Sequence, residues 1–529
     1  MTLRSSRVDR CIGALLFGAT VAYLAVLPHN LGRADEVFFL VEAKRLLHGE
    51  LMYRDLFWFA GPIAQWCMAI VFAIFGDTMT VARLAAAVLQ GGVALLLYGS
   101  ARRCGVRPEL ALAPPLLHVA FGVGLWPHAS PHWFSTLMMA AILYSLLADG
   151  RVARPAGAVL PGVCTGALAL SHQHQGAVFA LAVLALFGLE SAIARRSGHA
   201  LPPRTWWYAC RWYALGTAAV ALPGIVFLLA TTGATPLIEQ TILHPLSGYR
   251  HYNRTAWGAV TTGAFALYTW PPLLRWAPFA LLPALLRLAA GWRQRRPLAE
   301  LDRLAVLLLI GIASMVSVAY MPDIVHLGFI APLLFVAGVE GLEALLHRWS
   351  SRPVLARAAA ALLAVALLGT VAARSVRTYR LLWRDYPFHA QTAFGGIDFG
   401  MAQEVRLIEL IDAVMADHPD RLLFAYPTWS PAYLAADTQN PTGHPLFMPD
   451  YLPEVEIDRT LAALASKRPP YILVMNFGLV RGDDRILPWV REHYEVERTD
   501  TDPSLPYTLY RRRDVPPPSQ DGGTGVGRL

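Results

Sequence analysis

The loop after the first apolar segment opens with Ala34-Asp35-Glu36-Val37-Phe38-Phe39 and closes with Tyr53-Arg54-Asp55. Two groups of acidic residues therefore lie next to a long apolar run. A carboxylate beside hydrocarbon is costly unless it is solvated, paired or used in chemistry. This stretch predicts a functional site at a membrane surface, on a chain that otherwise consists mainly of apolar segments.

The composition of the whole chain indicates a membrane protein. Apolar residues make up 55% of the 529 residues and charged residues only 16%, with a mean hydropathy of +0.41. A soluble domain carries about 25% charged residues. The formal net charge of +8 does not indicate nucleic-acid binding, because Lys and Arg stand in short loops between apolar runs. We therefore expect no nucleic-acid partner.

Apolar segments of bilayer-crossing length, roughly 20 residues, recur along the first part of the chain. We expect about eleven transmembrane helices, near residues 11–28, 79–99, 110–126, 132–148, 156–171, 175–191, 212–231, 257–288, 304–320, 325–346 and 356–373. Residues 62–75 form a shorter apolar run. We expect this run to be an interfacial or re-entrant helix that does not cross the bilayer.

Arginine clusters distinguish the two sides of the membrane. Arg4, Arg7 and Arg10 precede the first segment, and further clusters follow in alternate loops after it. Cytoplasmic loops are enriched in Lys and Arg, so we expect a cytoplasmic N-terminus. After an odd number of spans the C-terminal region then lies outside the cytoplasm. If residues 62–75 crossed the membrane, every later loop would change sides and the arginine clusters would face outward.

The chain is predicted to have three regions. We expect a transmembrane module over residues 1–374 that includes an outer loop at 29–78, an extracytoplasmic α/β domain over 375–513 and a disordered tail over 514–529. Within the α/β domain, the residue patterns predict helices at 403–415 and 457–467 and strands at 421–426, 471–476 and 507–511.

The first outer loop resembles that of the C-type (GT-C) membrane glycosyltransferases. The resemblance rests on Asp35-Glu36, Ala43-Lys44-Arg45-Leu46-Leu47-His48-Gly49, Tyr53-Arg54-Asp55-Leu56, the short helix that begins at Pro62, and Arg83-Leu84. A weaker similarity lies at Pro322-Asp323-Ile324-Val325-His326-Leu327. Within that superfamily, the chain is most similar to the group of protein O-mannosyltransferases and lipid A aminoarabinose transferases, and especially to its bacterial members.

This resemblance implies a polytopic α-helical GT-C fold in a bacterial inner membrane, with the C-terminal domain in the periplasm. It also implies an inverting transfer of a sugar from a polyprenyl-phosphate donor to an extracytoplasmic lipid, glycan or protein. Carried over to this sequence, Asp35 is the general base that takes the proton of the acceptor hydroxyl, and Glu36 orients the loop or the acceptor. Many relatives begin the short helix with Lys-Pro-Pro, where this chain has Ala60-Gly61-Pro62-Ile63.

The growing negative charge on a departing lipid phosphate needs a positive or hydrogen-bonding partner. Arg54 and Arg250 are the leading candidates, and His326, one helical turn after Asp323, is the third. Further histidines stand at the ends of predicted spans, in pairs at 128 and 132 and at 172 and 174. The full predicted set for donor phosphate and substrate is Tyr53, Arg54, Asp55, His132, His172, Tyr249, Arg250, Asp323 and His326.

Other interpretations of these residues stay open. Asp35 and Glu36 could cap the helix that begins near Val37, and Arg54 could simply pair with Asp55. The histidines could line the acceptor cavity or hold a metal. A divalent cation bound by Asp35 and imidazoles is a further option, although the spacing matches no zinc pattern. A transporter or flippase, or a ligase, of lipid-linked saccharides is the alternative function.

Overall fold

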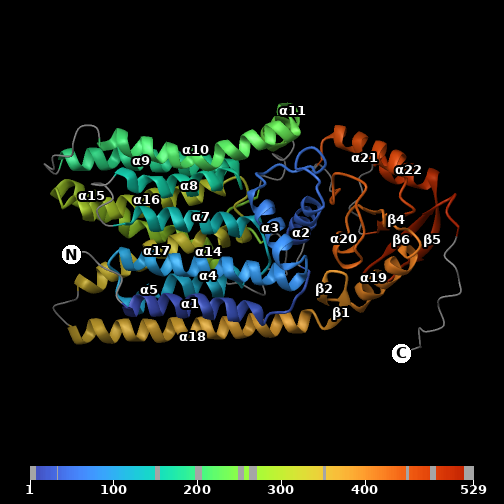
Figure 1. Cartoon of the computed structure of the whole chain (residues 1–529). Coiled ribbons are helices and arrows are strands. Elements are labelled where there is room, and N and C mark those ends of the chain that lie inside the picture. The colour runs from blue at the N-terminus through green and yellow to red at the C-terminus, as the bar shows by residue number, and fades with distance from the viewer. Residues whose placement is uncertain are drawn as a thin grey trace.

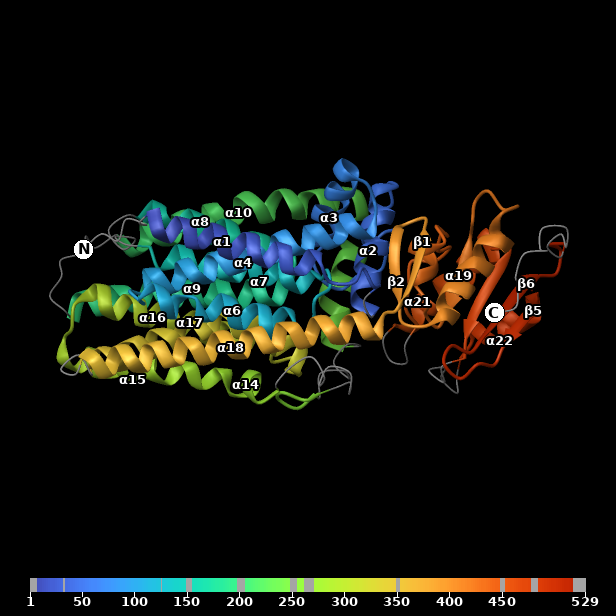
Figure 2. The same cartoon turned by 90° about the horizontal axis from the view of Figure 1, so that it is seen from below.

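The structure consists of a long helical bundle and a smaller α/β domain at one end of it (Figure 1). This computed structural model describes residues 7–31, 34–124, 126–148, 155–196, 205–247, 255–260, 271–348, 353–447, 452–476 and 484–516. Helix α18 (Pro353–Asp385) runs along the side of the bundle and leads into the C-terminal domain, as the view from below shows (Figure 2). The predicted tail falls largely on residues 517–529, which lie outside the described residues.

The helices of the bundle correspond to the predicted apolar segments. They are α1 (Arg7–Ala25), α4 (Met79–Arg103), α5 (Pro108–Ala111), α6 (Ala113–Leu117), the π-helix η1 (His118–Val123), α7 (Pro131–Leu146), the 3-10 turn η2 (Pro155–Ala158), α8 (Val159–Ala169), α9 (Gln173–Arg196), α10 (Thr205–Thr232), α14 (Pro271–Trp276), the 3-10 turn η5 (Ala277–Leu281), α15 (Leu282–Gln294), α16 (Leu298–Ser317), α17 (Ile324–Arg348) and α18. The prediction of a polytopic helical membrane protein is therefore confirmed.

Seven helices among the described residues are long and apolar enough to cross a membrane. They are α1, α4, α9, α10, the run from Leu273 to Gln294, α17 and α18. The other predicted spans are shorter, more charged or interrupted. Residues 108–123 are divided into α5, α6 and η1, because prolines at 108, 114 and 115 cannot donate backbone hydrogen bonds. In the predicted span 257–288, the first described helix begins at Pro271.

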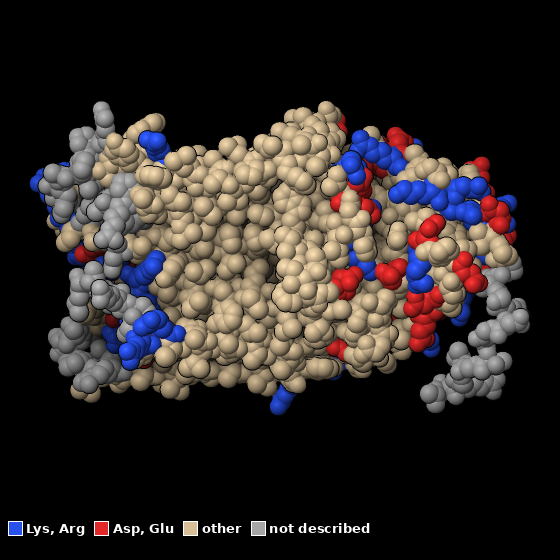
Figure 3. Space-filling model, viewed as in Figure 1, with Lys and Arg blue, Asp and Glu red and all other residues tan. Residues whose placement is uncertain are grey.

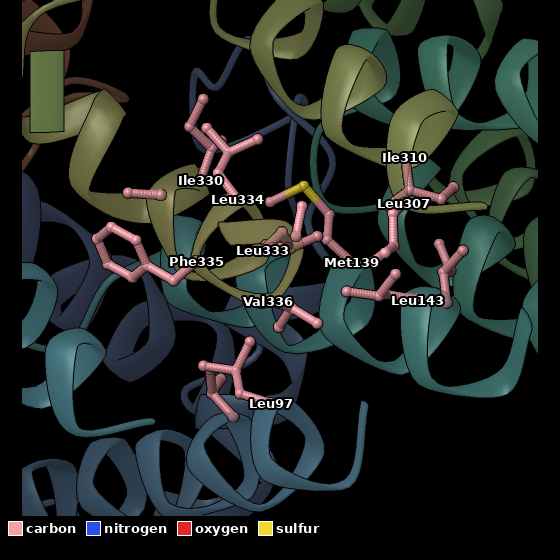
Figure 4. Packing of buried hydrophobic residues seen from close by; sticks show 14 of the residues in the cluster. Leu97, Met139, Leu143, Leu307, Ile310, Ile330, Leu333, Leu334, Phe335 and Val336 are labelled. Carbon is pink, nitrogen blue, oxygen red and sulfur yellow. The ribbon is translucent and has the colours of Figure 1, made fainter. Parts of the chain in front are cut away.

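Helix α17 occupies the centre of the bundle. About two thirds, 67%, of its most apolar window is buried, compared with 11% for α10. Its side chains pack with those of α4, α7 and α16 in one apolar cluster (Figure 4), which includes Leu97, Met139, Leu143, Leu307, Ile310, Leu333 and Val336. A helix that is apolar all round is buried among other helices, whereas the exposed apolar side chains of α10 are suited to contact with lipid.

Short helices lie where the bundle meets the C-terminal domain (Figure 1). Helix α2 (Ala34–Leu47) and helix α3 (Ile63–Phe75) belong to the first outer loop. With 13 residues, α3 is about 20 Å long and shorter than a bilayer core. After α10, the chain forms α11 (Ala234–Ile238), the π-helix η3 (Glu239–Leu243) and α12 (His244–Ser247). The C-terminal domain thus faces this layer of short elements.

The C-terminal domain is built on a four-stranded sheet. Its elements are the hairpin β1 (Phe388–Thr392) and β2 (Gly395–Phe399), then α19 (Ala402–Met415), β3 (Leu423–Tyr426), α20 (Pro431–Ala435), α21 (Glu454–Lys467), β4 (Tyr471–Met475), α22 (Ile486–His493), β5 (Tyr494–Asp500) and β6 (Tyr507–Arg512). The strand order is β3-β4-β6-β5, in which only β3 and β4 are parallel. All five elements predicted in this domain are present at nearly the predicted positions, but β1, β2, α20, α22 and β5 were not predicted.

A broad band of the bundle surface carries almost no charged side chains (Figure 3). Lys and Arg gather at the end of the bundle away from the C-terminal domain, and both signs of charge cover the domain itself. At the end of the bundle away from the C-terminal domain, ion pairs join Arg107 with Glu343 at 2.8 Å and Arg287 with Glu340 at 2.6 Å. An uncharged band between two charged ends is the surface expected of a protein embedded in a bilayer.

Candidate active site

The acidic pair lies at the start of helix α2. Asp35 is the second residue of this helix, and its side chain lies outside the described residues. The next residue, Glu36, is fully buried. A buried carboxylate must be paired or hydrogen-bonded, so the partners of Glu36 show how the beginning of α2 is fixed.

Arg83 of helix α4 forms a two-point ion pair with Glu36. Its Nη1 lies 3.0 Å from Oε1 of Glu36, and its Nη2 donates to Oε2 at 3.1 Å. The backbone N–H of Ala129 donates to Oε1 at 2.8 Å. Both carboxylate oxygens of Glu36 are therefore engaged, and the planar guanidinium sets their orientation.

The same arginine binds the chain on the other side of Asp35. Its Nη2 donates to the backbone oxygen of Asn30 and, at 3.3 Å, to the Asn30 side-chain oxygen. Asp398 of strand β2 accepts from the backbone N–H of His29 at 2.7 Å, so the hairpin of the C-terminal domain fixes this segment as well. Residues on both sides of Asp35 are thus held by one buried side chain.

The segment between η1 and α7 connects Glu36 with a group of histidines. Arg83 Nη1 donates to the carbonyl oxygen of Pro127 at 3.0 Å, and Nδ1 of His128 lies 3.0 Å from the same nitrogen. Ser130 then caps α7 by accepting from the backbone N–H of His132 at 3.3 Å. Helix α7 therefore begins where the Arg83 contacts end, and His132 stands in its first turn.

Four histidines from distant parts of the sequence, His132, His172, His174 and His326, lie together near the start of α7. The ring of His132 lies 4.6 Å from that of His172 and 5.0 Å from that of His326, and the rings of His172 and His174 are 6.0 Å apart. Asp323 Oδ1 lies 2.8 Å from Nδ1 of His326 and also accepts from its backbone N–H. The structure thus brings together His132, His172, Asp323 and His326, all predicted from the sequence.

His172 is fixed by hydroxyl groups on one side. Its Nδ1 lies 2.8 Å from Oγ of Ser135 and 3.1 Å from Oγ of Ser171. Burial lowers the pKa of His172 well below its usual value, and the neighbouring rings of His174 and His326 lower it further. A neutral imidazole with one nitrogen bound in this way keeps its other nitrogen, Nε2, for a ligand.

The start of α3 lies directly against the turn that carries His172. The backbone N–H of Gly61 donates to Ser171 O at 2.9 Å, and that of Ile63 donates to Leu170 O at 3.0 Å. A Cβ atom at residue 61 would lie 2.0 Å from Leu170 O. Only glycine permits this approach, which accounts for Gly61 in the tetrapeptide where this chain departs from the Lys-Pro-Pro pattern.

Tyr53, Arg54 and Asp55 form a separate group. Within the described residues, the side-chain hydrogen bonds of Arg54 all go to Asp55, the shortest at 2.7 Å, and the Arg54 side chain is 53% exposed. Tyr53 is buried and donates its hydroxyl to the backbone oxygen of Ala60. The hydrogen bonds of this triplet therefore support the loop itself. Tyr249 and Arg250 lie outside the described residues.

Sequence reasoning missed two polar groups of this region. Arg83 was noted only as the start of a span, although a single arginine inside an apolar helix indicates an inward-facing partner. Glu42 lies two helical turns after Asp35 on α2 and accepts from Gln65 at 3.1 Å. Burial raises the pKa of Glu42 to about 8, against smaller lowering effects of Gln65 and Arg45. The sequence did contain a signal for Glu42, because it is an acidic residue two helical turns after Asp35.

The described residues contain no group of three or more His, Cys, Asp or Glu side chains arranged to hold a metal ion. The histidine rings contact one another edge-on or stacked, and His174 and His326 each use one ring nitrogen on protein oxygens, at 3.1 Å from Ser317 O and 2.8 Å from Asp323 Oδ1. The side chain of Asp35 lies outside the residues to which this observation applies.

Comparison with known proteins identifies the fold. ArnT from Cupriavidus metallidurans, in a crystal structure bound to undecaprenyl phosphate, matches 95% of this chain and 97% of its own with a TM-score of 0.56 at 14% identity. This chain has the ArnT-like GT-C fold. The apo structure of ArnT from the same organism gives a TM-score of 0.53 over the same shares. The fold predicted from the resemblance of the first outer loop is confirmed.

Sequence relatives carry a consistent name. The undecaprenyl phosphate-alpha-4-amino-4-deoxy-L-arabinose arabinosyl transferase of Pseudomonas aeruginosa strain UCBPP-PA14 is 30% identical over 164 residues. Transferase 1 of that name from Pseudomonas fluorescens strain Pf0-1 is 30% identical over 177 residues. These matches span 30% and 31% of the relatives' own length and 29% and 31% of this chain. No family model matches the chain.

Proposed function

We propose that this protein transfers a sugar from a polyprenyl-phosphate donor to an extracytoplasmic acceptor, with Asp35 as the general base. One observation carries the proposal: Arg83 binds both Asn30 and Glu36, on either side of Asp35, and Glu36 in turn accepts from Ala129, which precedes His132 by three residues. The GT-C fold and the names of the sequence relatives supply the class of reaction. A single displacement at a sugar carbon requires a positioned base for the acceptor hydroxyl and hydrogen-bonding groups for the leaving phosphate.

In the proposed reaction the acceptor hydroxyl oxygen attacks the anomeric carbon of the donor. The bond from that carbon to the phosphate oxygen breaks, the phosphate leaves with the electron pair, and Asp35 takes the hydroxyl proton. Because attack and departure occur on opposite faces, the configuration inverts. Glu36 orients the start of α2 through Arg83 and does not act on the acceptor, since it is fully buried and paired within the protein.

The proposed site for the leaving phosphate is the histidine group. His132, His172 and His326 come from three different helices or turns and converge within 5.0 Å ring to ring around His132. Nδ1 of His326 lies 2.8 Å from Oδ1 of Asp323, and this contact fixes the orientation of the ring. Arg54, Tyr53 and Asp55 on the outer loop, together with Tyr249 and Arg250, remain candidates for contacts to donor or acceptor.

The proposed location is a bacterial inner membrane, with a cytoplasmic N-terminus and a periplasmic C-terminal domain. The gathering of Lys and Arg at the end of the bundle away from this domain supports that orientation (Figure 3). The proposed acceptor is a lipid, a glycan or a protein outside the cytoplasm. A transporter, flippase or ligase has less support, because the relatives are named as transferases.

The test measures transfer from radiolabelled polyprenyl-phosphate sugars in membranes that contain the wild-type chain or Asp35→Asn. The undecaprenyl-phosphate aminoarabinose of the relatives' name is the first donor to try. We expect transfer by the wild type and a loss of at least 100-fold in the folded variant. Equal transfer by both would exclude Asp35 as the base, and no transfer from any donor would favour the transporter alternative.

A further inference from the structure

The outer loop that carries Tyr53 to Phe59 contacts the C-terminal domain through Phe57. The backbone N–H of Phe57 donates to Gly443 O at 3.1 Å. Its ring lies 4.7 Å from that of His444 in the domain and 5.1 Å from that of His244 in α12 of the membrane module. Phe57 is therefore buried between two histidines that belong to different parts of the molecule.

Residues 440–444 of the domain are held by hydrogen bonds within the domain itself. The Asn440 side chain donates to His444 O at 2.6 Å and accepts from the backbone N–H of Thr442 at 2.9 Å. The ring of His444 is fixed by Glu456 of α21, whose Oε2 lies 2.8 Å from Nε2. Gly443 approaches the loop so closely that a Cβ there would lie 3.1 Å from Asp55 O. These residues therefore form a hydrogen-bonded surface against residues 55–57.

The membrane module holds the same loop from the other side. Gln240 of η3 donates to Tyr53 O at 2.8 Å and accepts from the backbone N–H of Trp58 at 3.0 Å. Residues 53–59 form no helix or strand of their own. Fixing the backbone of such a segment costs about 1–2 kcal/mol per residue, so its order depends on these contacts from two sides.

Residues 440–444 also contact helix α2. Arg45 donates to Thr442 O at 2.9 Å, and Lys44 pairs with Asp437, which precedes the segment. Helix α2 begins with Asp35 and Glu36. The domain therefore contacts both the outer loop and the helix that carries the proposed base.

We propose that residues 440–444 are a positioning element of the transfer site, which hold the outer loop through Phe57 and helix α2 through Arg45. Phe57 and His444 are positioning residues in this scheme. The inference rests on the proposed function, and it gives the C-terminal domain a role in ordering the site, in place of a role as an independent module for acceptor binding.

The test compares Phe57→Ala and His444→Gln with Trp489→Ala. Trp489 is a matched control, because it stacks on His493 at 4.4 Å within the same domain and belongs to α22, away from the loop. Trypsin cleavage after Arg54, which is exposed in the loop, reports whether residues 53–59 are held. Steady-state transfer with the full-length protein in detergent reports kcat and the donor KM.

We expect Phe57→Ala and His444→Gln to speed cleavage after Arg54 and to lower kcat, each by at least 10-fold, with the donor KM within 3-fold of wild type. Trp489→Ala should change neither quantity. If Phe57→Ala does not fold, Gly443→Ala offers a milder change at the same contact. Wild-type cleavage rates, or faster cleavage with unchanged kcat, would overturn the inference. If the wild type transfers no sugar, the proposed function fails, while the cleavage rate still decides whether the segment holds the loop.

Discussion

Replacement of Arg83 by methionine should abolish most of the activity without removing the protein from the membrane. Arg83 is 6% exposed and its guanidinium binds Glu36, Asn30 and the carbonyl of Pro127. Methionine fills a similar length without charge, so the buried Glu36 carboxylate would lose the guanidinium that pairs with both of its oxygens. Removing one member of a buried ion pair costs about 3–5 kcal/mol.

That cost acts on the segment around Asp35. A factor of ten in population corresponds to about 1.4 kcal/mol, so a loss of about 3–5 kcal/mol reduces the fraction of molecules in which Asn30 and Glu36 keep their observed positions by up to about 10²–10⁴-fold. We expect kcat to fall by at least 100-fold. The fall is limited to the lower part of this range if the loop recovers order when the donor binds.

The assay is transfer of radiolabelled sugar by purified protein, together with hydrogen exchange of residues 30–36 by mass spectrometry. Arg287→Met is the matched control, because Arg287 pairs with Glu340 at 2.6 and 2.7 Å near the other end of α17. It should lower thermal stability and leave kcat within 3-fold of wild type. A double replacement, Arg83→Met with Glu36→Gln, removes the unpaired charge and should recover part of the stability. Retention of more than a third of wild-type kcat by Arg83→Met, with unchanged exchange, would refute the reasoning.

Three further predictions concern the first outer loop. Burial raises the pKa of Glu42 from an ordinary 4.5 to about 8, so between these pH values the folded state binds a proton that the unfolded state has released. The contribution of Glu42 to stability is therefore fully present below pH 4.5 and falls by about 5 kcal/mol as the pH rises to 8. Glu42→Gln should flatten the melting temperature between pH 5 and 8. Gly61→Ala should lower the melting temperature and the transfer rate, because its Cβ meets Leu170 O, whereas Gly188→Ala, with open space around it, should change neither. Arg54→Ala should leave melting unchanged, since an exposed pair contributes under about 1 kcal/mol; a 10-fold rise in donor KM would assign it to the phosphate, and an unchanged KM would exclude it.

Hydropathy alone predicted most of the bundle, because transfer of a helix into lipid depends on the composition of a contiguous run. The same reasoning failed where the backbone departs from regular helix. The run at residues 108–123 has the composition of a span, yet Pro114 and Pro115 divide it into short pieces. Strands β1 and β2 were missed because five-residue strands with Gly395 and Gly396 show little alternation, and the hairpin gains order from His29 and Asn30, far away in the sequence.

The sequence by itself determined the class of the protein, the short outer helix α3 and the acidic pair at the start of α2, since each depends on residues that are neighbours along the chain. The tertiary structure decided which side chains meet: Arg83 with Glu36 and Asn30, His132 with His172 and His326, and Phe57 with His244 and His444. Such contacts join residues separated by tens to hundreds of positions. Their geometry follows from how helices pack and where loops end, and these are properties of the whole fold that no local pattern encodes.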